Sequence, residues 1–137
     1  MEKTGQDNNI FKGNSIFKSI GIALRGISYL FLHHRNMRII FLAGFVAFLL
    51  GLYLKLRSVE LVALCITITV VFVAEITNTA IELLMDTVSE KYHPRIKLVK
   101  DISAAVVLLT CLNAIAIGYI IFVRKIIYYS GGIHGYY

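Results

Sequence analysis

Three long runs of uncharged, mostly apolar residues constrain this chain more than any other feature. They cover residues 39–54, 61–74 and 102–123. A helix that crosses a membrane needs about 20 predominantly apolar residues. The third run has that length, and neighbouring residues extend the first two toward it. The pattern therefore predicts an all-α membrane protein with three transmembrane helices, at about residues 37–55, 59–86 and 102–123.

The composition agrees with a membrane protein and argues against a nucleic-acid-binding one. Apolar residues make up 58% of the 137 residues and charged residues only 16%, whereas soluble domains average about half and about a quarter. The length corresponds to one domain. The net charge of +6 comes from basic residues that flank the apolar runs, which is typical of orientation signals. We expect no nucleic-acid partner.

An amphipathic helix is predicted before the first span, at about residues 15–34. Its apolar side chains recur at helical spacing, for example at Ile20, Leu24 and Ile27, whereas Lys18 and Arg25 fall on the opposite side. A basic amphipathic helix beside a membrane span is typical of a helix that lies in the membrane interface. We therefore expect an interfacial helix here.

The two ends of the chain are less informative. Residues 1–14 are polar and lack the basic-then-apolar order of a signal peptide, so we expect no cleavage. Residues 124–137 form an aromatic, glycine-rich tail, whose tyrosines are expected to anchor at the interface. Cys65 and Cys111 lie inside apolar runs, where cysteine behaves as a small hydrophobe.

The distribution of basic residues predicts the orientation in the membrane. With three spans, the N-terminal segment and the connection at residues 87–101 lie on one side, and they carry six and four Lys or Arg residues. The other side carries only Lys55, Arg57, Arg124 and Lys125. Because positively charged loops stay in the cytoplasm, we expect the N-terminus and this connection to be cytoplasmic.

The second span ends in a row of polar residues within the stretch EITNTAIELLMD at residues 75–86. At about 100° per residue, one helix face carries Glu75, Asn78, Thr79, Glu82 and Asp86. Carboxylates near hydrocarbon depth usually face a bundle interior or a wet cavity and mark a functional site. Either the row holds a cation or the helix leaves the membrane with this face in water. The first is favoured because the other side stays apolar past Glu82, at Ile81, Leu83, Leu84 and Met85.

The connection that follows adds cations to the same side of the membrane. It contains Lys91, Arg95, Lys97 and Lys100 next to Asp101. Carboxylates for a hard divalent cation and lysines for phosphate are the combination that phosphoryl transfer requires. Basic loops are also common orientation signals, and the sequence lacks the soluble signatures GxxxxGK[ST] and GxGxxG. The alternative is a protein without enzymatic activity, either a proton or ion pathway through Glu75 and Glu82 or a catalytically lapsed scaffold.

Three thin spans cannot shield both sides of the polar row, so the sequence also predicts association of several copies. Small residues recur at helical spacing at Gly44, Ala47 and Gly51, and again at Ala114 and Gly118. Small residues let membrane helices approach closely. We expect neighbouring copies to pack through one of these faces.

The sequence resembles the family of small bacterial integral-membrane lipid kinases, the diacylglycerol and undecaprenol kinases. The resemblance rests on AEITNTAIELLMD at residues 74–86, on YHP at 92–94, on KD at 100–101, and on the order of elements from about residue 15 to 123. The family combines an interfacial helix with three spanning helices, forms homotrimers in the bacterial inner or plasma membrane, and transfers the ATP γ-phosphate to a lipid hydroxyl with Mg²⁺. The resemblance implies the same fold and activity here.

The resemblance also implies roles for individual residues. Glu75 corresponds to the general base that takes the proton of the lipid hydroxyl, and Asn78 to a second residue of the catalytic site. Glu82 corresponds to the carboxylate that ligates the metal bridging the phosphates. The other residues implied in ATP binding are Asp86, Lys91, Tyr92, His93, Lys100 and Asp101.

The sequence departs from the family pattern at three positions. His34 stands where the family has a glutamate that gives the metal a second carboxylate, and imidazole suits Mn²⁺ or Zn²⁺ better than Mg²⁺. Ser15 stands at a family arginine, and Ile22 at an aromatic residue near the nucleotide. The match of NTAIE, YHP and KD favours undecaprenol over diacylglycerol as the lipid, and the residues give no independent reason for that choice.

Overall fold

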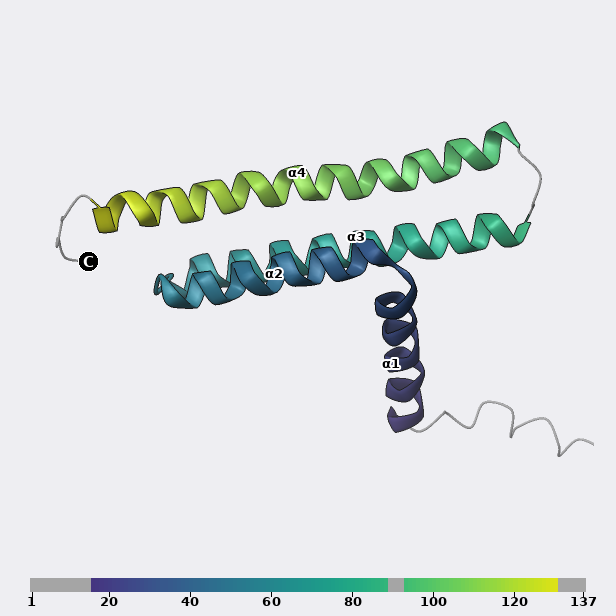
Figure 1. Ribbon diagram of the computed structural model, residues 1–137, viewed down its shortest axis with the longest axis horizontal. Coiled ribbons are helices and arrows are strands. Elements are labelled where there is room, and N and C mark those ends of the chain that lie inside the picture. Colours follow the sequence, from purple (N-terminus) through teal and green to yellow (C-terminus); the bar gives the residue numbers. More distant parts are fainter. Residues whose placement is uncertain (1–15, 89–92, 131–137) are drawn as a thin grey trace, which may run out of the picture. The chain divides into compact units, whose positions relative to one another are not determined.

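The computed structural model describes residues 16–88 and 93–130, and within these residues the chain is helical without strands. Four helices follow one another: α1 (Ile16–His33), α2 (Arg35–Tyr53), α3 (Ser58–Val88) and α4 (Pro94–Ser130) (Figure 1). The last three are long and apolar enough to cross a membrane. The predicted all-α membrane fold, with one helix before three candidate spans, is confirmed.

Helix α1 belongs to a separate unit of the chain, Met1–His34, and is described by itself. Its apolar side chains at Ile20, Leu24 and Ile27 are exposed. On the opposite side of the helix, Lys18 and Arg25 are exposed as well. An apolar stripe beside a cationic one suits a helix that lies in the membrane interface, and that location stays a prediction.

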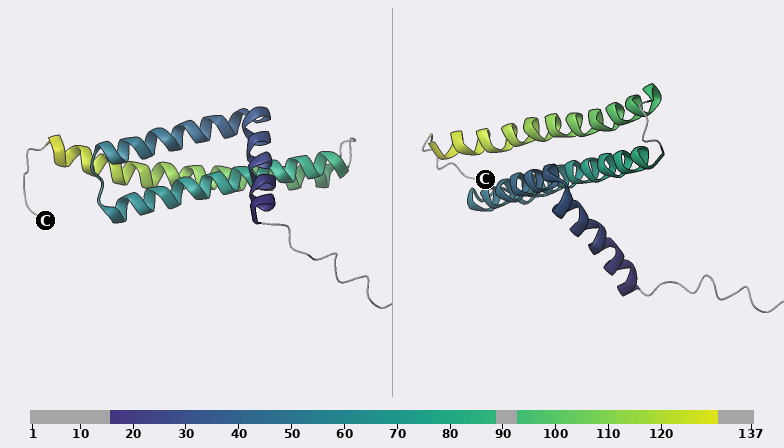
Figure 2. Two further views of the ribbon diagram at one scale, coloured as in Figure 1. Left: turned by 90° about the horizontal axis from the view of Figure 1, so that it is seen from below. Right: turned by 45° about the vertical axis from the view of Figure 1, so that its right-hand side comes forward.

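Helix α3 is the centre of the second unit because it packs against both α2 and α4. Helix α2 runs beside the first part of α3, and α4 runs beside α3 and past the end of α2 (Figures 1 and 2). Gly44 of α2 lies so close to α3 that an added Cβ would sit 2.9 Å from Cγ2 of Ile68, and one at Gly51 would sit 3.1 Å from Leu64. The small face of α2 is therefore used within the chain. Ala114 and Gly118 of α4 line the space between the same three helices, where a Cβ at Gly118 would meet nothing within 4 Å.

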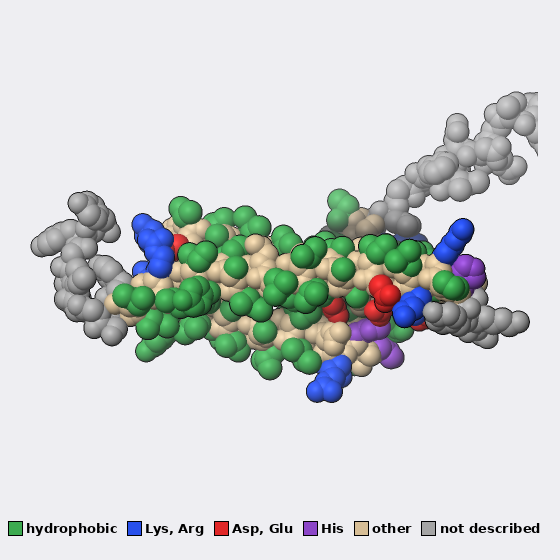
Figure 3. All heavy atoms as spheres, turned by 90° about the horizontal axis from the view of Figure 1, so that it is seen from above, with side chains coloured by type: hydrophobic (Ala, Val, Ile, Leu, Met, Phe, Trp, Pro, Cys, Tyr) green, Lys and Arg blue, Asp and Glu red, His purple; other side chains and the backbone are tan. Residues whose placement is uncertain are grey.

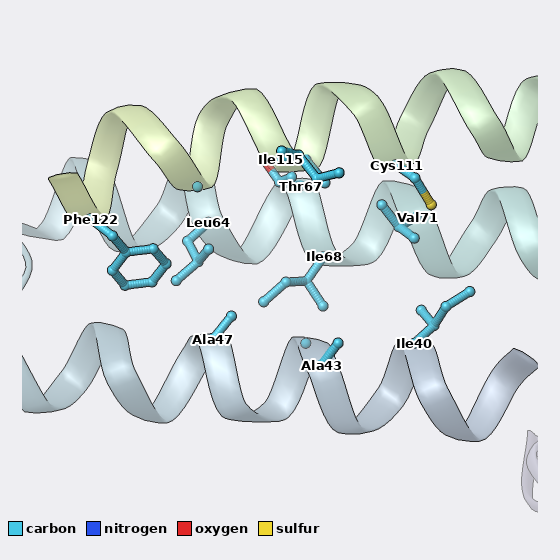
Figure 4. Close-up of a pocket in the computed structure, with 13 residues that line it drawn as sticks. Ile40, Ala43, Ala47, Leu64, Thr67, Ile68, Val71, Cys111, Ile115 and Phe122 are labelled. Atoms are coloured by element: carbon cyan, nitrogen blue, oxygen red, sulfur yellow. The ribbon is translucent and has the colours of Figure 1, made fainter.

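An apolar cleft of about 410 Å³ lies between the three helices (Figure 4). Small residues line it from α2 and α4, including Ala43, Ala47 and Ala114, while Leu64, Ile68 and Val71 contribute from α3. In Figure 4 the labelled side chains from α2 and α3 point toward one another across this space. The cleft ends along α3 at Val71, one helical turn before Glu75.

The turn between α2 and α3 explains why the two helices return antiparallel over so few residues. Lys55 has a left-handed backbone with φ of 50°. The backbone N–H of Lys55 donates to the carbonyl of Leu52, and that of Leu56 donates to the carbonyl of Gly51. This pair of bonds is the Schellman motif that closes helix C-termini. Helix α3 then begins with the backbone N–H of Arg57 bonded to the Glu60 carboxylate at 2.9 Å, as in a capping box.

Helix α4 is longer at both ends than the span predicted at residues 102–123. It begins at Pro94, so residues 94–100 are helical although the sequence suggested a connection there. His93 caps this end: its ring Nδ1 accepts the backbone N–H of Arg95 at 3.2 Å, and its carbonyl accepts the N–H of Lys97. Proline suits the first helical position because the missing N–H would be unpaired there anyway. At the other end α4 continues to Ser130, into the predicted tail.

Charged side chains gather toward the ends of the molecule. In Figure 3 charged groups lie at the left end of the face shown and over its right-hand part, and hydrophobic side chains cover the stretch between them. At one end, a second contact joins Arg57 to Glu60 at 3.4 Å. At the other, α3 and α4 carry the polar row and its cations. The apolar middle is the part that a bilayer would cover.

The close approach at Gly44 gives a first prediction. Gly44→Val places methyl groups against Ile68, whose β-branched side chain is stiff in a helix, and overpacking of this kind costs about 1–3 kcal/mol. Gly26→Val in α1 is the matched control because the same group meets open space there. We expect thermal unfolding in detergent to show a lower midpoint for Gly44→Val than for Gly26→Val. Equal midpoints would contradict the α2–α3 packing.

Candidate functional site

The polar row of α3 passes from buried to exposed along the helix. Glu75, Asn78 and Thr79 are only 4%, 8% and 1% exposed, Glu82 is half-buried and Asp86 is exposed. The first two turns of the row therefore face the interior of the bundle. The alternative that the whole polar face of this helix points into water is wrong for Glu75, Asn78 and Thr79.

A hydrogen-bond network joins this row to α4. Asn78 Nδ2 donates to Oε1 of Glu82 at 3.0 Å, one turn along the same helix. The Ser103 hydroxyl lies 2.7 Å from Oδ1 of Asn78 and 2.9 Å from the backbone carbonyl of Lys100. Ser103 is itself 6% exposed. The Glu82 carboxylate is thus held by an amide whose other end is held by the neighbouring helix.

A second contact between α3 and α4 lies nearer the ends of the helices. Lys100 Nζ lies 2.5 Å from Oδ1 of Asp86. Both side chains keep substantial exposure, 34% for Lys100 and 65% for Asp86, so the pair adds little to stability, at most about 1 kcal/mol. Its position matters more, because it brings a cation within reach of the Glu82 end of the row.

The remaining predicted ATP-binding residues lie at the start of α4 or outside the described residues. His93 is exposed and uses Nδ1 to cap α4, which leaves Nε2 for another contact. Asp101 is exposed. Lys91 and Tyr92 fall outside the described residues. The capping by His93 and Pro94 accounts physically for two of the three letters of the YHP motif.

His34 belongs to the other unit of the chain and is described there alone. It lies between α1 and α2, and its backbone N–H donates to the carbonyl of Leu30 at 2.9 Å. Its ring lies 6.0 Å from the Tyr29 ring, centroid to centroid, and the His33 ring stacks on the same tyrosine at 4.4 Å. The structure therefore leaves the predicted contact of His34 with a metal untested.

The carboxylates of the row suit a metal that arrives with a nucleotide better than a preformed metal cage. Among the described residues no cluster of three or more His, Cys, Asp or Glu residues is present. Mg²⁺ typically uses only one or two carboxylates together with substrate phosphates and water. Glu82, half-buried with one oxygen already accepting from Asn78, offers its second oxygen for such a role, and Asp86 lies one turn further.

Ser103 is the member of this cluster that sequence reasoning missed. A serine three residues after Lys100 carries no motif, and mid-helix serines commonly bond their own backbone. Helical spacing offers one signal, since Lys100, Ser103 and Val107 share a face of α4. Only the pairing of the two helices shows that this face meets Asn78.

Comparisons with known proteins agree with this architecture. The family model described as prokaryotic diacylglycerol kinase matches residues 21–122. A diacylglycerol kinase of Synechocystis is 33% identical over 76% of this chain, which corresponds to 60% of that protein's length. An undecaprenol kinase of Bacillus subtilis is 32% identical over 82% of this chain and 92% of its own. A diacylglycerol kinase of Escherichia coli is 26% identical over 79% and 88%.

Proposed function

The chain belongs to the prokaryotic diacylglycerol kinase family, a family of membrane lipid kinases, and we propose that it transfers the γ-phosphate of ATP to the hydroxyl of a membrane lipid. One observation carries the proposal. A buried carboxylate, Glu75, and a half-buried one, Glu82, lie seven residues apart on one face of a membrane helix. The lipid that accepts the phosphoryl group, at hydrocarbon depth, and the ATP that donates it, from the aqueous side, meet between these two carboxylates.

In the proposed reaction Glu75 is the general base. The lipid hydroxyl oxygen attacks the γ-phosphorus and forms a new P–O bond, while the bridging P–O bond to the β-phosphate breaks. ADP leaves with that electron pair, and the hydroxyl proton passes to the Glu75 carboxylate. The position of Glu75 supports this role, because its carboxylate is buried one helical turn beyond the apolar cleft, where a lipid hydroxyl can reach it. Asn78, one turn away, completes the catalytic site.

The nucleotide is proposed to bind at the exposed end of the row. Glu82 and Asp86 supply carboxylate oxygens there, and Lys100 supplies a cation at the same place. Lys91, Tyr92, His93 and Asp101 are proposed to complete the ATP-binding site. Glu82 would hold Mg²⁺ that arrives with ATP, and the ion would supply neutralisation of the phosphate charge. Mn²⁺ or Zn²⁺ would serve if His34 provides a ligand, because imidazole suits these ions better.

Undecaprenol is the proposed acceptor, with diacylglycerol the next candidate. Support comes from the pattern of NTAIE, YHP and KD and from similarity to the Bacillus undecaprenol kinase over 92% of that protein's length. The apolar cleft that ends one turn before Glu75 offers hydrocarbon surface to the chain of either lipid. Because the cleft suits the hydrocarbon chain of either lipid, the choice of lipid depends on which hydroxyl group reaches Glu75.

We also propose that the protein works as a homotrimer in the bacterial plasma membrane, with the N-terminus and the site in the cytoplasm. The excess of basic residues on that side supports the orientation. Only 6% of the spanning stretch of α4 and 11% of α2 are buried within one chain. Asn113 carries an exposed amide in the middle of α4. Amides and small residues in spans favour helix association, and the number three rests on the family resemblance.

The first functional prediction concerns Glu75. Purified wild-type protein should transfer label from [γ-³²P]ATP to undecaprenol, separated by thin-layer chromatography, and label diacylglycerol less. Glu75→Gln keeps the size of the side chain but removes the base, so turnover should fall by roughly 10²-fold or more. Glu60→Gln, at the other end of α3, is the matched control and should stay active. Full activity of Glu75→Gln would eliminate Glu75 as the base, and a wild type that labels no lipid would favour the alternative of a non-enzymatic protein.

The second functional prediction concerns His34. If this residue approaches the metal, His34→Glu restores an oxygen ligand and should raise activity in Mg²⁺ several-fold while reducing the advantage of Mn²⁺. His33→Glu, one residue earlier, is the matched control because it adds the same charge. The ratio of the rates in Mg²⁺ and Mn²⁺ is the measurement. An unchanged ratio in His34→Glu would show that His34 is not a metal ligand.

A further inference from the structure

The Ser103 hydroxyl faces two acceptors with a single proton. Oδ1 of Asn78 lies at 2.7 Å and the carbonyl of Lys100 at 2.9 Å. The Asn78 contact joins two helices, is buried, and links residues 25 apart in the chain. The Lys100 contact is local to α4. The choice between these acceptors depends on which way the Asn78 amide is turned.

The charge on Glu82 decides the direction of the Asn78 amide. An ionised carboxylate only accepts hydrogen bonds, so Nδ2 of Asn78, at 3.0 Å from Oε1, must be the atom that faces it. Oδ1 then points to α4, and its partner must be a donor. Ser103 provides that donor, whereas an alanine at this position would leave Oδ1 buried without one.

We propose that Ser103 is a positioning residue of the kinase site: by donating to Asn78, it fixes the amide that holds the Glu82 carboxylate toward the nucleotide. This inference rests on the proposed function. Ser103 does not touch the lipid or ATP, and it acts through Asn78. It also sets the register between α3 and α4, because the bond forms only when these two residues are level.

The role predicts a specific change in kinetics. Removal of one partner from a buried hydrogen bond commonly changes an equilibrium by roughly tenfold. Ser103→Ala should therefore raise the KM for Mg·ATP roughly tenfold. The KM for the lipid should stay unchanged, because the lipid hydroxyl is proposed to meet Glu75. A general loosening of the helix pair would raise both constants together.

Two further variants separate the hydroxyl from the size of the side chain. Ser103→Thr keeps the donor and should restore the KM for Mg·ATP to near the wild-type value. Thr110→Ala is the matched control, because the Thr110 hydroxyl also bonds a carbonyl three residues back on α4, that of Val107 at 2.9 Å. This variant removes a local bond without an interhelical one and should leave both KM values unchanged.

A double-mutant cycle with Asn78→Ala tests the coupling without ATP or metal. Thermal unfolding in detergent should show that Ser103→Ala lowers the midpoint in the wild-type background and has little further effect when Asn78 is already alanine. Equal decreases in the two backgrounds would overturn the coupling. An active wild type with an unchanged KM for Mg·ATP in Ser103→Ala would overturn the positioning role alone. A wild type without kinase activity would overturn the proposed function, and the positioning role with it.

Discussion

Burial of polar side chains within an apolar bundle is the constraint on which the rest of this structure depends. Asn78, Thr79 and Ser103 are among the polar side chains buried between these mostly apolar helices, and such groups are costly unless each finds a partner. The bond from Ser103 to Asn78 meets this requirement across two helices. It ties the pairing of α3 and α4 to the same atoms that orient Glu82, so fold and site are stabilised together.

Because α3 is long, its polar row has one buried part and one exposed part. The helix has 31 residues, which is longer than the roughly 20 that a bilayer requires. Its final turns therefore carry the row from the buried Glu75 to the exposed Asp86. In the proposed reaction, this one helix presents one carboxylate to the lipid and another to the water-soluble nucleotide. This arrangement suits a lipid kinase, because one of its substrates is dissolved in the membrane and the other in water.

Much of this could be predicted from the sequence, and the limits have physical reasons. Apolar runs fix the three spans, and the 100° period puts the polar residues on one face. Periodicity does not reveal which residue of another helix lies opposite, so Ser103 was missed although Asn78 was found. Similarly, Gly44 predicted close helix packing, but only the structure shows that its neighbour is Ile68 of the same chain. The start of α4 was placed too late because His93 and Pro94 form a cap that apolar patterns do not show.

The central claim is that the row on α3 holds a metal-bound triphosphate through Glu82. Electron paramagnetic resonance of Mn²⁺ in the presence of ATP measures this binding directly and without turnover. The wild type and Glu60→Gln, altered about 33 Å away on the same helix, should bind Mn²⁺·ATP equally, and Glu82→Gln should bind it at least about tenfold more weakly. Equal binding by the wild type and Glu82→Gln would contradict the account.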